Sequence, residues 1–160
     1  MVGGLTALVG SKILGPRIGR FDDGDQPAVD LKGHSVPFAM LGAFMLMFGF
    51  FAFNGVAALS VNVSSRRGHI MAFSMVNTLM SASTSAMVAL LIEQFILHQK
   101  WSLLRMVNCV LASMVAICAS CEQLYPWAAC IVGLSAASVC VFAEFALVHF
   151  KIDDPLQASA

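Results

Sequence analysis

Charge is what this sequence has least of. Asp, Glu, Lys and Arg make up 11% of its 160 residues, whereas 59% are hydrophobic. A typical soluble domain carries about 25% charged residues. The nine basic and nine acidic side chains also cancel, so no excess of positive charge favours nucleic acid as a partner. The composition excludes an ordinary soluble domain and indicates a protein of the lipid bilayer.

The sequence also lacks the patterns of a metal site and of a secretory leader. Its four His residues are scattered, at positions 34, 69, 98 and 149, which is not the spacing of metal ligands. Cys118 and Cys121 have a Cys-x-x-Cys spacing, but no basic or His neighbour activates them, which favours small-residue packing over redox chemistry. No basic stretch precedes an apolar core at the N-terminus, as a signal peptide requires. We expect no metal and no cofactor.

Long apolar runs are what the sequence does contain. Residues 36–61 carry no charge and are interrupted in their interior only by Asn54 and Ser60. About 20 helical residues cross the roughly 30 Å hydrocarbon core, so this run is long enough to span it. Its twelve Leu, Phe and Val residues each favour insertion by about 0.3 to 0.6 kcal/mol, and their sum outweighs one amide in mid-span.

Similar segments, bounded by charge or Pro, follow along the rest of the chain. We expect four full spans and a partial helix at each end, within a single partial domain over residues 1–160. The full spans are expected at residues 36–61, 69–97, 103–121 and 126–150, and the partial helices at residues 1–14 and 154–160. The predicted fold class is all-α, a polytopic helical membrane protein.

The basic residues predict the orientation, because Lys and Arg are retained on the cytoplasmic side of a membrane. Seven fall on one side of the predicted spans and two on the other: Lys12, Arg17, Arg20, Lys32, Lys100, Arg105 and Lys151 against Arg66 and Arg67. We therefore expect an integral membrane protein, in the plasma membrane, with the loops at residues 15–35, 98–102 and 151–153 in the cytoplasm.

Several short motifs occur in a fixed order along the chain. They are LGPRIGRF (14–21), GHSVP (33–37), GFFAFNG (49–55), VNT (76–78), WSLL (101–104), VAI (115–117), PWAA (126–129) and KIDDP (151–155). In this order they resemble the ammonium transporter family (Amt and Mep, with the Rh glycoproteins as relatives). The resemblance covers essentially the whole chain and places it between the end of the fifth and the start of the tenth transmembrane helix of that family.

The resemblance implies a homotrimer whose protomers have roughly eleven helices and one narrow apolar pore each. The family function is the passage of ammonium or ammonia across the bilayer. An apolar pore disfavours the charged form of its substrate, so the cation is expected to lose a proton at an aromatic gate before ammonia crosses. This function requires no covalent catalysis, and we expect no enzyme.

Four residues match positions along the family's pore. Phe53 matches one ring of the aromatic gate, Phe50 stands where many members have Trp, and Leu46 matches an apolar lining position. Ala57 stands where the family usually has a Ser whose hydroxyl helps to recruit the cation, so recruitment is expected to be weaker here. The i, i+4, i+7 spacing of Leu46, Phe50 and Phe53 is equally typical of ordinary helix packing.

Other polar residues of the spans and motifs are assigned structural roles. Asn54, Asn77 and Asn108 are expected to be buried amides that bridge neighbouring helices, although a place for Asn54 near the substrate path stays open. Asp153 and Asp154 belong to the KIDDP motif, which reads as a polar helix-start signal.

Departures from the family pattern leave alternatives for the function. Arg105 replaces a usual small residue and is expected to extend toward the membrane surface. By alignment, the family's two pore His fall just before Met1 and just beyond Ala160, so the 160 residues alone are expected to be inactive in transport. The alternatives are an incomplete sequence and a truncated, non-transporting membrane subunit that associates with full-length relatives.

Overall fold

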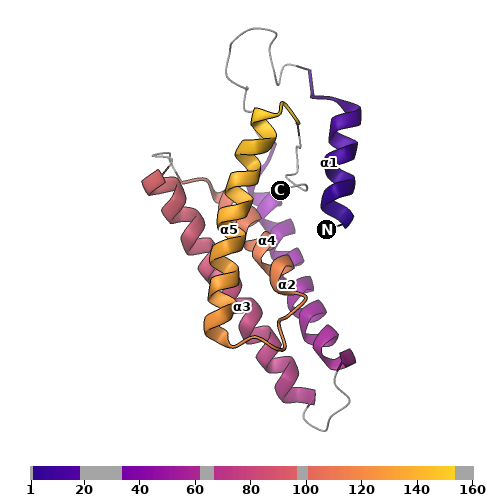
Figure 1. Ribbon diagram of the computed structural model, residues 1–160, viewed down its shortest axis with the longest axis vertical. Coiled ribbons are helices and arrows are strands. Elements are labelled where there is room, and N and C mark those ends of the chain that lie inside the picture. The colour runs from indigo at the N-terminus through magenta and orange to yellow at the C-terminus, as the bar shows by residue number, and fades with distance from the viewer. Residues whose placement is uncertain (1, 19–33, 62–66, 97–100, 154–160) are drawn as a thin grey trace. The chain divides into compact units, whose positions relative to one another are not determined.

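The computed structural model describes residues 2–18, 34–61, 67–96 and 101–153, and every regular element in these ranges is helical (Figure 1). The elements are α1 (Val2–Leu14), α2 (Val36–Val61), α3 (Arg67–Leu91), the π-helix η1 (Ile92–Ile96), α4 (Leu103–Ile117) and α5 (Pro126–His149). The predicted all-α fold class is confirmed. The predicted helix start at residues 154–160 lies outside the described residues.

Within the described residues, three segments are long and apolar enough to cross a membrane, namely Val36–Ala57, Gly68–Ile96 and Pro126–His149. The expected full span at residues 103–121 differs, because α4 ends at Ile117 after 15 residues. At 1.5 Å per residue such a helix is about 22 Å long, short of the roughly 30 Å hydrocarbon core. Turns replace the helix from Cys118 to Gln123, and Asn77 of α3 binds the Cys121 carbonyl there.

The ends of the helices follow local sequence rules. Ser102 caps α4, since its side chain accepts a hydrogen bond from the Arg105 N–H, and α5 begins at Pro126, which lacks the N–H that a first turn leaves unpaired. At the other end α1 is followed by Gly15, at φ +76°, whose N–H bonds the Ser11 carbonyl at 3.1 Å. A residue in the left-handed conformation ends a helix at little conformational cost when that residue is Gly.

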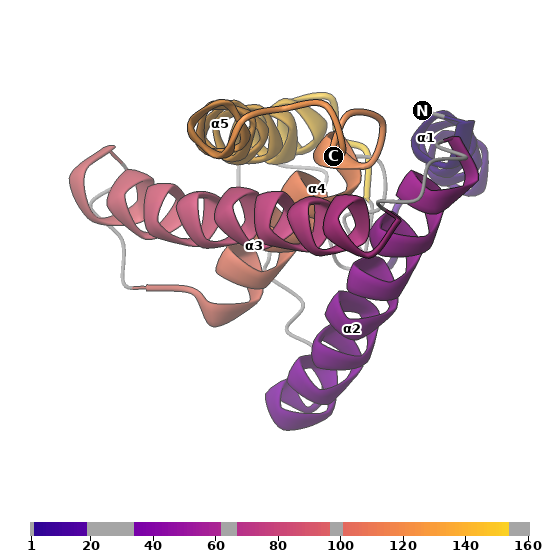
Figure 2. The same cartoon turned by 90° about the horizontal axis from the view of Figure 1, so that it is seen from below.

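The chain divides into two compact units. One contains residues 1–34 and 139–160, and the other contains residues 35–138. In the larger unit α3 packs against both α2 and α4, and α2 also contacts α4, so that the three helices lie side by side (Figures 1 and 2). Among the described residues, buried apolar side chains cluster around Ala82, Val110 and Met114, and others cluster around Ile117, Cys121 and Ala129.

Small residues bring α3 and the first half of α5 into close contact. A Cβ added at Gly133 would collide with the backbone carbonyl of Ser81 and would lie 3.1 Å from the Ser81 Cα. Helices in membranes associate through such small residues, because lipid gives no hydrophobic drive for helix pairing and backbone proximity maximises van der Waals contact. Gly133 is therefore required by this helix crossing.

Replacing Gly133 with Ala tests the crossing. We expect Gly133→Ala to lower the free energy of unfolding in detergent by about 1–3 kcal/mol, because the added methyl group forces backbone apart. Gly42→Ala on α2 is the matched control, since nothing lies within 4 Å of its added Cβ, and it should raise stability by about 0.5–1 kcal/mol. Equal effects of the two substitutions on the unfolding midpoint would contradict the close crossing.

Candidate functional site

The pore-matching residues of α2 point in two different ways. Leu46 and Phe53, seven residues apart, are 55% and 61% exposed and lie on one face of the helix, two turns apart. Phe50 is instead half-buried and packs against the cluster of Ala82, Val110 and Met114. Leu46 and Phe53 thus form the accessible part of this stripe, whereas Phe50 lies at the edge of the stripe that meets the bundle.

Asn54, next to Phe53, faces inward and is fully buried. Its side-chain Nδ2 donates to the Thr78 hydroxyl at 3.1 Å, and its backbone carbonyl accepts from the Ser74 hydroxyl at 3.0 Å. Its Oδ1 has no hydrogen-bond partner among the residues that the structure describes. The two bonds to α3 fix the rotation of α2 at this level, and so hold Phe53 on the accessible side.

A polar stripe runs along the face of α3 that meets its neighbours. Its members are all fully buried and occur about once per helical turn, with Asn77 and Thr78 adjacent: Ser74, Asn77, Thr78, Ser81 and Ser85. Asn77 donates to the Cys121 and Leu124 carbonyls at 2.8 and 2.6 Å, and Ser85 donates to the Cys109 carbonyl at 2.7 Å. The α3 stripe therefore binds backbone acceptors of α2, of α4 and of the turn after α4.

Asp153 of the KIDDP motif forms a close ion pair in the smaller unit. Arg17 donates to Asp153 through its backbone N–H at 3.1 Å, its Nε at 2.6 Å and its Nη2 at 3.0 Å. The carboxylate side chain is 3% exposed and the Arg17 side chain 43% exposed. The hydrogen bond to Asp153 raises the pKa of Arg17 above its ordinary value, so the guanidinium stays charged. This pair ties Arg17, which follows α1, to Asp153, which follows α5.

Sequence reasoning missed a second ion pair, which is formed by Arg105. Its Nη1 donates at 3.0 Å to Oε1 of Glu93, a fully buried residue of the π-helix η1. The other carboxylate oxygen accepts from the N–H of Ser102 at 2.8 Å, at the N-terminus of α4 where negative charge is favoured. A lone Glu at the end of an apolar segment, with an Arg twelve residues later, was the available signal.

The other residues singled out in the sequence lie on α2, on α4, in the turn after α4 or outside the described ranges. Asn108 is half-buried on α4 and Ala57 is half-buried near the end of α2. Asp154 lies outside the described residues. Cys118 and Cys121 are both free thiols, and the Cys121 Sγ lies 3.8 Å from the Asn54 carbonyl. Within the described residues, no group of His, Cys, Asp or Glu is arranged to hold a metal ion.

Comparison with known proteins identifies the family. Residues 1–160, the whole chain, match the Ammonium Transporter Family. The chain belongs to the ammonium transporter family. It is 42% identical to the putative ammonium transporter 1 of Caenorhabditis elegans over 161 residues, covering 100% of this chain and 30% of that protein. The family suggested by the ordered motifs is thus confirmed.

Solved structures agree with this assignment. This chain superposes on the Sensor Amt Protein structure with a TM-score of 0.86 and 32% sequence identity. The superposition covers 99% of this chain and 37% of the Sensor Amt Protein chain. It also superposes on the crystal structure of Candida albicans Mep2 with a TM-score of 0.78 and 29% sequence identity, over 98% of this chain and 32% of the Mep2 chain. The chain therefore has part of a helical membrane transporter fold and is an integral membrane protein that spans about a third of the length of its relatives.

The ion pair of Arg17 with Asp153 predicts that the planar guanidinium group, and not its charge alone, stabilises the protein. Arg17→Gln should lower the free energy of unfolding in detergent by about 1.5–3 kcal/mol, because charge-assisted hydrogen bonds to a buried carboxylate are lost. Arg17→Lys keeps the charge but loses the planar fork, so we expect it to recover less than half of the loss. Thermal unfolding followed by circular dichroism measures both variants. Wild-type stability in Arg17→Lys would show that charge alone is sufficient.

Proposed function

We propose that this chain forms part of an ammonium-conducting pore. The observation that carries the proposal is the match of all 160 residues to the Ammonium Transporter Family, with 42% identity to a putative ammonium transporter. The family resemblance assigns pore positions to α2, and the structure of α2 supplies an accessible face with two of those residues. The substrate class is therefore ammonium and ammonia.

Phe53 is proposed as the residue of this chain that contacts the cation. Its ring is accessible, and an aromatic face attracts a cation through its quadrupole. Asn54 supports this role by holding α2 to α3 through Thr78 and Ser74, which keeps the neighbouring ring on the accessible side. Leu46, two turns away on the same face, is proposed to continue the lining with an apolar surface.

The chemistry of this lining accounts for passage of the neutral molecule. An aromatic ring holds ammonium where water still reaches it, whereas an apolar surface beyond the ring destabilises the charged form and lowers the pKa of ammonium. Ammonia, which carries no net charge, crosses that surface at much lower cost. Ala57 offers no hydroxyl to share in the recruitment, so the ring of Phe53 makes the larger contribution in this chain.

The assembly and orientation are also proposals. We infer that the complete protein is a homotrimer in the plasma membrane, with residues 15–35, 98–102 and 151–153 in the cytoplasm, as the family resemblance and the distribution of Lys and Arg indicate. The three membrane-length helices support a polytopic arrangement. Phe50 is proposed to stabilise the lining, through its contacts with the buried cluster, while Phe53 contacts the substrate.

A chimera tests the pore assignment. Residues 1–160 replace the matching segment of the C. elegans relative, and ammonium uptake is measured in yeast cells that lack their own ammonium transporters. We expect the chimera to restore uptake and Phe53→Ala to reduce it about two- to fivefold, since a cation–π contact at an exposed site contributes on the order of 0.5–1 kcal/mol. Phe48→Ala is the matched control, because Phe48 is an exposed Phe of the same helix on a different face.

The outcomes of this experiment distinguish a role of these residues in ammonium passage from a purely structural role. Equal uptake by the Phe53→Ala and Phe48→Ala chimeras would contradict the role of Phe53. A chimera that reaches the membrane as a folded trimer but takes up no ammonium would contradict the proposed function. It would favour the alternative, a non-transporting subunit, especially if the 160 residues expressed beside the full-length relative copurify with it and reduce its uptake.

A further inference from the structure

A cavity beside the ends of α1 and α5 carries two lysines that no other described residue engages. The cavity has a volume of about 210 Å³ and lies within the smaller unit. Its lining comprises Ser11, Lys12, Gly15, Pro16, Phe150, Lys151 and Ile152. A single buried water needs only about 10–15 Å³, so the cavity has room for a group much larger than one structural water.

The two lysines are the available donors of this cavity. The Ser11 hydroxyl already donates to the Ala7 carbonyl at 2.7 Å, and the N–H groups of Gly15, Lys151 and Ile152 donate to helix carbonyls. Neither Lys12 nor Lys151 forms an ion pair or side-chain hydrogen bond with another residue in the described ranges. The carboxylate of Asp153 is engaged by Arg17, and the two charged residues in the described lining of the cavity are both lysines.

Lys151 is held at the cavity by a backbone conformation that rarely suits a lysine. Its φ is +54°, and its N–H and that of Ile152 bond the carbonyls of Val148 and Leu147, each at 3.0 Å. This is the cap at which proteins usually place Gly, as α1 does with Gly15. A side chain at such a position costs conformational energy that Gly avoids, and here that side chain brings a charge to the cavity.

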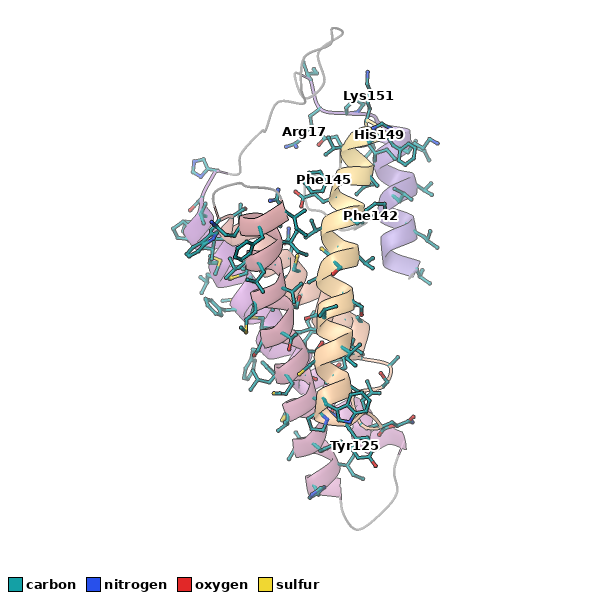
Figure 3. All side chains as sticks on the ribbon, turned by 60° about the vertical axis from the view of Figure 1, so that its left-hand side comes forward. Arg17, Tyr125, Phe142, Phe145, His149 and Lys151 are labelled. Atoms are coloured by element: carbon teal, nitrogen blue, oxygen red, sulfur yellow. The ribbon has the colours of Figure 1, made fainter. Side chains whose placement is uncertain are left out.

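The location of the cavity favours a lipid as its occupant. α5 is a membrane-length helix that ends at His149, so residues 150–152 lie at the level of the headgroups, and Lys151 stands beyond His149 in Figure 3. Two lysines at this depth attract anionic headgroups, and the side chains of Phe150 and Ile152 add apolar walls. We propose that this cavity binds the phosphate of a net-negative lipid headgroup, with Lys12 and Lys151 as its ligands.

Lipid titrations of the purified 160-residue chain in detergent test the proposal. Native mass spectrometry compares phosphatidylglycerol with phosphatidylcholine of the same acyl chains, which share the phosphate but differ in net charge. We expect wild type to bind phosphatidylglycerol about tenfold more tightly. We expect Lys12→Gln/Lys151→Gln to lose that preference and Lys12→Arg/Lys151→Arg to keep it, because the double Arg variant retains both charges.

Two further measurements make the result decisive. Lys151→Gly removes one charge while relieving the left-handed turn, so it should unfold at the same or a higher temperature and still lose part of the preference. An unchanged preference in Lys12→Gln/Lys151→Gln would overturn the site. Displacement of phosphatidylglycerol by an equal concentration of inorganic phosphate would overturn the lipid as its source, whereas resistance to phosphate supports it.

Discussion

Hydrogen bonds from the α3 stripe to backbone carbonyls of its neighbours are the interaction on which the larger unit depends. In a lipid environment apolar side chains gain little by leaving lipid for a helix interface, so polar contacts and close packing must hold helices together. The stripe supplies both, because Ser, Thr and Asn are small enough to let backbones approach and each carries a donor. Asn77 reaches two carbonyls at once, and Gly133 approaches the backbone at Ser81.

This arrangement connects packing to the proposed pore. α2 has apolar residues on all sides, so its own composition does not choose which face is accessible. The choice is made by Asn54, whose bonds to Thr78 and Ser74 turn one side of α2 toward α3. Phe50 then packs inward and Phe53 remains accessible. A buried amide can therefore determine which aromatic ring of α2 is accessible.

The sequence alone was sufficient for the helices and the family, and insufficient for the orientation of side chains. Apolar runs of 20 or more residues predict membrane helices almost regardless of detail, and the ordered motifs identify the family. The spacing of Leu46, Phe50 and Phe53 is compatible with a single stripe, but it does not say where that stripe faces. The end of α4 at Ile117 and the pairing of Arg105 with Glu93 depend on tertiary contacts that hydropathy does not contain.

The most direct test of this account compares two serines of α3. Ser85 is buried and donates to α4 at the Cys109 carbonyl, whereas Ser83 is exposed and donates to Leu79 within its own helix. The free energy of unfolding in mixed micelles should fall by about 0.6–2 kcal/mol in Ser85→Ala and change by less than about 0.5 kcal/mol in Ser83→Ala. Equal effects of the two substitutions would contradict the claim that the α3 stripe holds the bundle together.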